Sequence, residues 1–200
     1  MGNNPTLPSF AFGLAWVALL PACQNQDDII QAARFGDLEK LSDCIESGIS
    51  VDHADPVGET PLFHIIGAGS EKAFELLMAN GADIRLRDSQ GNTTLHKAVN
   101  FGRREFALQL IEWGLDINAT NKVGATALHY AVRSGNLGMV EFLVEKGAEV
   151  EVKNADDISP AQVAQAMSEQ EGFSDPMGRM ISKKQMDKIM SALTKPTINK

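Results

Sequence analysis

Four histidines are the side chains best able to do chemistry in this chain of 200 residues, by binding a metal or by moving a proton. His96 and His129 occupy equivalent positions in a regular spacing, whereas His53 and His64 do not follow it. A zinc site takes four ligands as a rule, and no further cysteine or histidine stands near either regularly spaced histidine to complete one. The sequence therefore predicts no metal site.

Catalytic motifs are also missing from the sequence. It contains no G-x-S-x-G nucleophile turn, no phosphate-binding Walker A loop and no H-E-x-x-H pair. Two acidic pairs, Asp27-Asp28 and Asp156-Asp157, stand where helices are expected to begin. Carboxylates at that end of a helix interact favourably with its dipole and stabilise the helix. This structural role accounts for both pairs, so they do not indicate a catalytic site. We expect a protein that is not an enzyme and needs no cofactor.

The N-terminal segment is typical of a targeting signal. Residues 1–22 carry no charged side chain, and residues 10–22 form the apolar run FAFGLAWVALLPA. A helix needs about 20 apolar residues to span a bilayer, so the run is better suited to the apolar part of a signal peptide. The sequence LPAC that ends at Cys23 resembles the lipobox of bacterial lipoproteins. A plain signal peptide and myristoylation of Gly2, in M-G-x-x-x-[ST], are the alternatives.

The lipobox resemblance implies cleavage after residue 22 and a lipid on Cys23, with residues 23–25 as a short tether. Gln24, in place of an aspartate, resembles the outer-membrane pattern of Gram-negative lipoproteins. We therefore expect a periplasmic location, on the outer rather than the inner membrane, and a cytoplasmic one if the segment is retained. An acylated Cys23 would exclude a disulfide, so Cys44, in an apolar column, is predicted to be a buried free thiol.

The charge of the chain limits its partners. The formal net charge is -8, and the residues before Pro176 hold 12 basic and 25 acidic side chains. Nucleic acids and anionic lipid surfaces need a basic face, so we expect no binding of nucleic acid and no membrane contact beyond the lipid anchor. A protein partner with a basic surface is the natural complement.

The body of the chain is periodic. The same residue types recur at the distance that separates Gly58 from Gly91, and the pattern runs without a gap from Asp27 to Asp157. Three glycine columns and three apolar columns share this spacing. The glycines are Gly58, Gly91, Gly124; Gly36, Gly69, Gly102, Gly135; and Gly48, Gly81, Gly114, Gly147, and the apolar columns are Ile29, Leu62, Leu95, Leu128; Ala32, Ile65, Ala98, Ala131; and Ile45, Met78, Ile111, Val144. Such periodicity is the signature of a repeat architecture, in which each unit buries its apolar face against the next.

Two motifs within the period resemble those of ankyrin repeats. The segments TPL at 60–62, TTLH at 93–96 and TALH at 126–129 are similar to the ankyrin TPLH motif, and NGADI at 80–84, WGLDIN at 113–118 and KGAEV at 146–150 to its GADVN turn. The resemblance covers about residues 26–165 and implies an all-α solenoid with hairpin-like loops between helix pairs. It also implies that His96 and His129 are structural and bond to the backbone near the preceding hairpin.

The spacing divides residues 26–194 into four repeats and a cap. The repeats are 26–57, 58–90, 91–123 and 124–156, the cap is 157–194 and the tail is 195–200. In repeat one we expect helices over 28–35 and 38–47. In the cap, a polar segment at 168–176 is expected to delay the second helix, and Ser182 and Gln185 have the spacing of a capping box at its start.

The family resemblance implies binding through the hairpin tips and the groove-facing surface of the first helices. The candidate partner-binding residues are Phe35, His64, Arg87, Lys97, Phe101, Tyr130 and Arg133. Phe35 and Phe101 share a column that is commonly polar in ankyrin arrays, so each either binds a partner or packs on its own array. Trp113, in the turn after a second helix, is expected to pack.

We predict a monomeric, non-catalytic protein-binding module, held in the bacterial envelope by a lipid. Inhibition of a toxin, as an immunity protein, and stabilisation of an envelope enzyme are both consistent with this function. An envelope scaffold without a tight partner and a cytosolic or host-targeted ankyrin adaptor remain as alternatives.

Overall fold

A computed structural model describes residues 23, 25–169, 174 and 178–194; the predicted signal segment and the C-terminal tail lie outside this part. The described residues contain ten α-helices and no strand longer than an isolated bridge. The helices are α1 (Asp27–Phe35), α2 (Leu38–Glu46), α3 (Pro61–Ala68), α4 (Glu71–Ala79), α5 (Thr94–Asn100), α6 (Arg104–Glu112), α7 (Ala127–Arg133), α8 (Leu137–Glu145), α9 (Pro160–Glu169) and α10 (Lys183–Leu193). None of them is long and apolar enough to cross a lipid bilayer.

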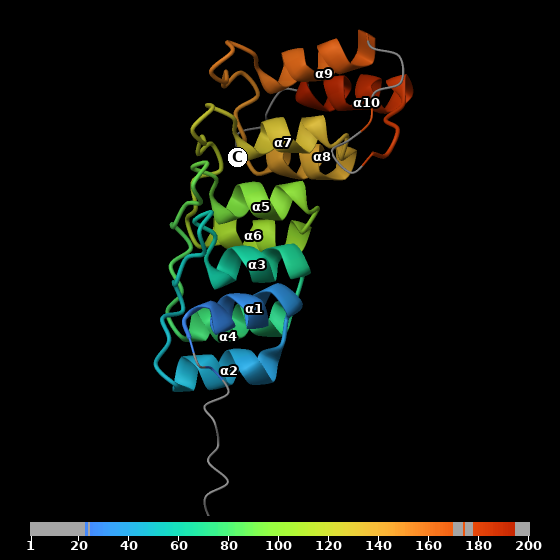
Figure 1. Cartoon of the computed structure of the whole chain (residues 1–200). Coiled ribbons are helices and arrows are strands. Elements are labelled where there is room, and N and C mark those ends of the chain that lie inside the picture. The colour runs from blue at the N-terminus through green and yellow to red at the C-terminus, as the bar shows by residue number, and fades with distance from the viewer. Residues whose placement is uncertain (1–22, 24, 170–173, 175–177, 195–200) are drawn as a thin grey trace, which may run out of the picture.

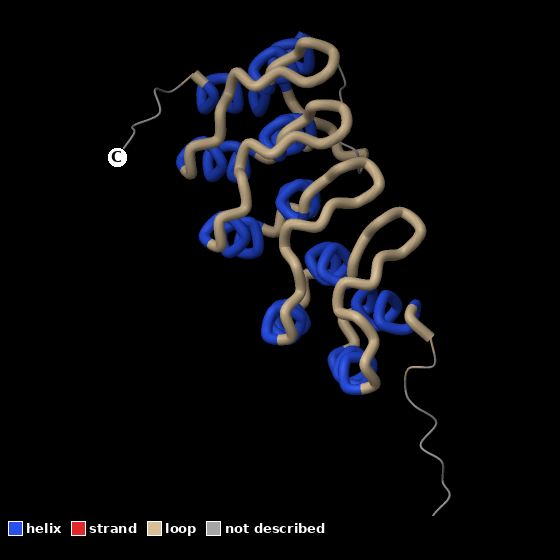
Figure 2. Tube along the Cα trace, turned by 90° about the vertical axis from the view of Figure 1, so that its left-hand side faces the viewer, coloured by secondary structure: helices blue, strands red, loops and turns tan. Residues whose placement is uncertain are grey.

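The helices stack as antiparallel pairs into an elongated array, which confirms the predicted all-α solenoid (Figure 1). The first helices α1, α3, α5, α7 and α9 pack on one another in series, and the second helices form a second row behind them. Figure 2 shows the two rows and the long loops between pairs, which all project to the same side. We call the ends of these loops, at about residues 53–59, 87–92, 120–125 and 153–158, the tips. Helices α3, α5, α7 and α9 each begin one period after the one before, as the spacing predicted.

Direct backbone hydrogen bonds join each tip to the next. The amide of Ser89 donates to Val57 O at 2.8 Å, and the amide of Ala155 donates to Val123 O at 2.9 Å. Gly58 makes this approach possible, because its φ is +80° and an added Cβ would lie 2.7 Å from the Ser89 nitrogen. The row of tips is therefore a connected edge of the array rather than a set of independent loops.

The core consists of the predicted apolar columns. The leucines and alanines of the first helices, represented by Leu95, Leu128, Ala98 and Ala131, are at most 1% exposed. In the apolar column of the second helices, Val144 is buried, but Ile45, Met78 and Ile111 are only partly buried. These three side chains pack at the edge of the core. Each buried Leu contributes about 1.5–3 kcal/mol, and these side chains hold the first helices in fixed register.

The last pair departs from the spacing. If the last pair kept the spacing, its second helix would begin one period after the start of α8, at residue 170. Helix α10 begins only at Lys183. Ser182 accepts a hydrogen bond from the Gln185 amide at 3.2 Å and so caps α10. The Gln185 side chain donates to Gly135 O of repeat four, so the predicted capping box is not reciprocal. Its amide group joins the cap to the array instead.

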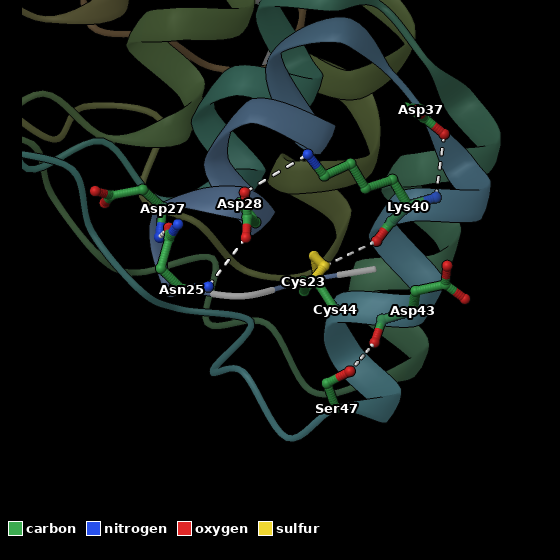
Figure 3. Close-up of a disulfide and its surroundings, with 9 residues drawn as sticks. All are labelled: Cys23, Asn25, Asp27, Asp28, Asp37, Lys40, Asp43, Cys44 and Ser47. Atoms are coloured by element: carbon green, nitrogen blue, oxygen red, sulfur yellow. Dashed lines mark hydrogen bonds and ion pairs between the residues drawn. A yellow bond between two sulfur atoms is a disulfide. The ribbon is translucent and has the colours of Figure 1, made fainter. Parts of the chain in front are cut away.

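The N-terminal end of the array is closed by a disulfide between Cys23 and Cys44, whose Cα atoms are 5.1 Å apart (Figure 3). Cys44 lies in α2 and is fully buried. The prediction that Cys44 is a free thiol is therefore wrong. A thioether-linked lipid on Cys23 is incompatible with this bond, because the sulfur that would carry it is already bonded to Cys44.

Polar contacts around the disulfide hold the start of α1 against α2. Asn25 Oδ1 accepts from the Asp27 amide at 2.9 Å, and the Asn25 amide donates to Asp28 Oδ2 at 3.0 Å. Lys40 Nζ of α2 lies 3.6 Å from Asp28 Oδ1 (Figure 3). Residues 23 and 25 are thus part of the first repeat in this structure, rather than a tether outside it.

Candidate functional site

The seven predicted binding residues lie on the first helices, directly after them, or in a tip. Lys97, Phe101 and Tyr130 line one pocket. The other four are distributed along the array: Phe35 ends α1, His64 is in α3, Arg133 ends α7 and Arg87 is in the tip before α5. The structure therefore brings three of the seven residues together in one pocket and leaves the other four outside its lining.

The pocket has a volume of about 130 Å³. Its lining comes from three repeats and consists of Glu59, Phe63, Asp88, Asn92, His96, Lys97, Asn100, Phe101 and Tyr130. Sites for drug-sized ligands are typically about 300–1,000 Å³, so this pocket has room for one side chain rather than for a cofactor.

Tyr130 is fixed in the pocket by a hydrogen-bond network. Its hydroxyl donates to Asn92 Oδ1 at 3.1 Å and accepts from Asn121 Nδ2, also at 3.1 Å. Asn121 Nδ2 further donates to Asn92 Oδ1 at 2.8 Å. The ring of His96 meets the Tyr130 ring edge-on, with 5.5 Å between centroids. An aromatic wall held in this way loses little entropy when a partner binds it.

Lys97 and Phe101 form the side of the pocket nearer to repeat two. The Lys97 ammonium pairs with the Glu59 carboxylate and lies 5.2 Å from the centroid of the Phe101 ring. Phe101 is 38% exposed, whereas Phe35, in the same column, is 78% exposed. Both rings are accessible, and of the two only Phe101 lines this pocket.

Next to the pocket, charged side chains and His64 form a row across repeats one to three. Asp55 Oδ2 lies 3.8 Å from the Arg34 guanidinium and 3.0 Å from His64 Nε2, and His64 Nδ1 lies 3.6 Å from Glu59 Oε2. Lys97 completes the row at Glu59. Burial raises the pKa of Asp55, but hydrogen bonds from the Glu59 amide, from His64 and from the Val57 amide outweigh it, so the pKa is lowered overall.

Asp55, Glu59 and His64 are also close enough to one another to share a metal ion. However, the two carboxylates face opposite nitrogens of the imidazole, and each carboxylate already has a cationic partner, Arg34 or Lys97. We therefore interpret the group as a network in which His64 bonds to the carboxylates and Arg34 and Lys97 form ion pairs with them. Burial lowers the pKa of His64, although both carboxylates oppose this effect.

His96 and His129 each bridge two loops. Nδ1 of His96 accepts from the Thr93 amide at 3.2 Å, at the end of the preceding tip, as the resemblance implied. Its Nε2 also reaches Ala125 O of the following tip at 3.0 Å, which the sequence did not indicate. His129 repeats both contacts with Thr126 and Ile158 O. Burial lowers the pKa of both histidines, so the neutral form with the proton on Nε2 is favoured.

Three further aromatic or basic residues are held by their own array. The Arg87 guanidinium donates to Gly91 O and to Thr120 O, both at 2.8 Å, so it links two tips. Arg133 lies over the Tyr130 ring at 4.7 Å. Trp113 stacks on Phe74 with 5.6 Å between centroids and 46% of its surface exposed, in agreement with the predicted packing role.

Among the pocket residues that are not candidate binding residues from the sequence, Glu59, Asp88 and Asn92 lie at the tips. Asp88 could have been found from its spacing, because it falls in the column Asp55, Asp88, Asn121, Asn154 at the tips. The first two members of this column are charged and the last two are neutral. The sequence alone does not show which of the carboxylates has a cationic partner.

Comparison with protein families agrees with this geometry. A family model for ankyrin repeats, in three copies, matches residues 29–121, and a single-repeat model matches residues 123–155. No curated protein matches the chain. The ankyrin fold is a non-catalytic protein-interaction fold. The matched residues cover more than half of the chain, and the chain belongs to the ankyrin repeat family.

Proposed function

We propose that this ankyrin array binds one partner protein through the groove face of repeats two to four and catalyses no reaction. The observation that carries the proposal is the open pocket between Phe101 and Tyr130, bordered by a connected row of tips. Aromatic residues in preformed pockets are the usual energetic centres of protein interfaces. The net acidity of residues 1–175 favours a partner with a basic surface.

We further propose that the protein acts in an oxidising compartment outside the cytoplasm, such as the bacterial periplasm. The disulfide between Cys23 and Cys44 supports this, because such bonds persist where thiols are not kept reduced. The apolar run at residues 10–22 supports it independently. In that compartment, a monomeric array of this kind would serve as an inhibitor, an immunity protein or a stabiliser of an envelope enzyme.

Intact mass and thiol counting decide the state of Cys23. With the disulfide, the mature chain has no thiol that reacts with an alkylating reagent before reduction and two afterwards. With a lipid on Cys23, the mass increases by the lipid and Cys44 alone reacts. The second result would restore the lipid anchor and remove the disulfide as support for the compartment. A mass that includes residues 1–22, with two free thiols, would favour the cytosolic adaptor.

Capture of partners from the source cells tests the binding function. The full chain with a C-terminal affinity tag is compared with Phe101→Ala and with a control, Met180→Ala. Alanine is the natural residue at position 68, the equivalent of Phe101 in repeat two, so the fold accepts it there. Met180 is 69% exposed and lies outside the pocket.

We expect one partner that binds the wild type and the Met180 variant and is weakened at least about tenfold by Phe101→Ala. Equal capture by all three proteins would place the interaction elsewhere on the array. The absence of any specific partner would favour the scaffold role.

A further inference from the structure

We propose that the pocket between Phe101 and Tyr130 receives a single arginine side chain of the partner, with its guanidinium directed at Asp88. This inference rests on the proposed function, because it names the chemistry by which the groove would recognise a protein. It goes further in assigning a cation subsite to the pocket and in naming Asp88, which is not among the candidate binding residues predicted from the sequence.

The charged side chains that line the pocket carry a net negative charge. Its lining holds two carboxylates, Glu59 and Asp88, and one ammonium, Lys97. Lys97 pairs with Glu59 of the preceding tip. Burial lowers the pKa of His96, so the imidazole adds no charge at neutral pH. One negative charge therefore remains in the lining, on Asp88.

Comparison within the array shows that Asp88 lacks the side-chain partner that Asp55, the equivalent residue one repeat earlier, has. Asp55, one repeat earlier, faces His64 of the helix that follows its tip. The residue that stands in the place of His64 after Asp88 is Lys97, but its ammonium contacts Glu59 instead. Within the described residues, the Asp88 carboxylate accepts only from the Gln90 and Asn92 amides and from the Asn92 side chain, and it forms no ion pair.

The aromatic walls are suited to a guanidinium. The chain itself places a cation on each of these rings, with Lys97 Nζ 5.2 Å from the Phe101 centroid and Arg133 Cζ 4.7 Å from the Tyr130 centroid. A planar guanidinium is weakly hydrated and stacks well on aromatic rings. Arginine is therefore preferred to lysine, whose ammonium is compact and strongly hydrated.

The remaining donors of an arginine would also find acceptors. Asn100 lines the pocket, and its side chain makes no hydrogen bond within the described part of the chain. The five N–H donors of a guanidinium form a fork that can reach a carboxylate and a neighbouring carbonyl together. The volume of about 130 Å³ limits the occupant to one side chain.

The test uses a small probe, so that it does not depend on finding the partner. The ¹⁵N-labelled full chain is titrated with N-acetyl-arginine methylamide, followed by amide chemical shifts. The lysine and citrulline equivalents serve as controls, and citrulline preserves the shape of arginine without its charge. We expect saturable shifts at Asp88, Asn92, Phe101 and Tyr130, with a Kd on the order of 1–10 mM, as for a single weak contact.

Asp88→Asn tests the carboxylate and keeps the turn of the tip, but it loses the hydrogen bond that Asp88 Oδ2 accepts from the Asn92 side chain. Asn121 and Asn154 occupy the same column, and their Oδ1 atoms accept the same pair of tip amides that Asp88 Oδ1 accepts. Asp55→Asn is the matched control, because it removes one charge from the same column outside the pocket lining. Asp88→Asn should weaken the arginine probe at least fivefold, and Asp55→Asn less than twofold.

The inference is overturned if the arginine probe causes no saturable shifts at the pocket. It is also overturned if citrulline or lysine binds as tightly as arginine, or if Asp88→Asn leaves the affinity unchanged. Capture of a partner that depends on Phe101 would still support the proposed function after any of these results, so the two ideas can fail separately.

Discussion

The ring of Phe101 lies over Gly67 of the preceding repeat, with Cζ 3.9 Å from the position that a Gly67 Cβ would occupy. Lys97 Cε lies 3.5 Å from the same position. The side chain of Phe101 thus has a seat on α3, whereas Phe35 belongs to the first repeat and has no earlier repeat on which to pack. The contrast in exposure between these two phenylalanines follows from this, and Phe101 combines packing on one side with an open pocket on the other.

Gly67→Ala should stabilise the protein by about 0.5–1 kcal/mol. Gly67 is near the end of α3, where alanine has the higher helix propensity, and the contacts an added methyl would make are ordinary van der Waals distances. Urea unfolding of the two proteins measures the difference. Gly69→Ala is the contrasting variant, because its φ is +82° and the Cβ would meet Arg103 Cζ at 2.7 Å. A loss of stability in the Gly67 variant would mean that Phe101 is packed more tightly than described.

The protein should lose stability as the pH falls below about 6.5. The pKa values of buried His96 and His129 are lowered from their ordinary value of 6.5, so the unfolded chain binds protons first. Their contribution is complete above that pH and is lost as the pH falls towards the folded-state pKa values. Each histidine changes the free energy of unfolding by at most about 1.4 kcal/mol per pH unit.

Urea unfolding at pH 7.5 and pH 5.5 measures this loss. His96→Asn/His129→Asn should be less stable at pH 7.5 but should lose less on acidification. An equal pH dependence in the double variant would assign the effect to other groups.

Thr60 and Thr126 stand in the same column, but valine should be tolerated only at Thr60. The Thr126 hydroxyl lies 2.9 Å from Nδ1 of His129, whereas the buried Thr60 hydroxyl has no hydrogen-bond partner in the described structure. Phe63 stands where a histidine would bond to Thr60. We expect Thr126→Val to cost about 1–2 kcal/mol and Thr60→Val to be neutral or stabilising, in parallel thermal and urea unfolding. Equal losses at both sites would contradict this assignment.

Reduction of the disulfide should destabilise the first repeat. The bond closes a loop with a sequence separation of 21, and removal of such a link costs about 3 kcal/mol in the chain-entropy model. Unfolding with and without a reductant, followed by amide hydrogen exchange, should show the loss concentrated in α1 and α2. Cys23→Ser/Cys44→Ser is the control and should not respond to the reductant. An unchanged wild type under full reduction would show that the bond does not stabilise the array.

The repeat architecture could be predicted from the sequence because one spacing governs many columns at once. The starts of α3, α5, α7 and α9 follow from it, and so do the buried Leu95 and Leu128. The late start of α10 was also foreseen, from the polar segment after α9. These features depend on local patterns and on contacts between neighbouring repeats, both of which the period displays.

The candidate site was less predictable, because it depends on the direction in which individual side chains turn. Lys97 could contact either Asp88 or Glu59, and the choice of Glu59 leaves Asp88 without a cation. Arg87 was predicted to bind a partner, and the sequence did not indicate that its guanidinium also spans two tips. Cys23 was interpreted from its neighbours in sequence, and its pairing with Cys44 depends on the packing of α1 against α2.

The covalent link between Cys23 and Cys44 also sets the mechanical path through the molecule. A force applied to residues before Cys23 passes through the sulfur atoms directly into α2 and bypasses the stretch of sequence between the two cysteines. Helix α1 is therefore shielded from being peeled away from α3. With the bond intact, an array pulled from its N-terminal side would take up the load at α2, and the oxidation state of two sulfur atoms would decide whether α1 opens first.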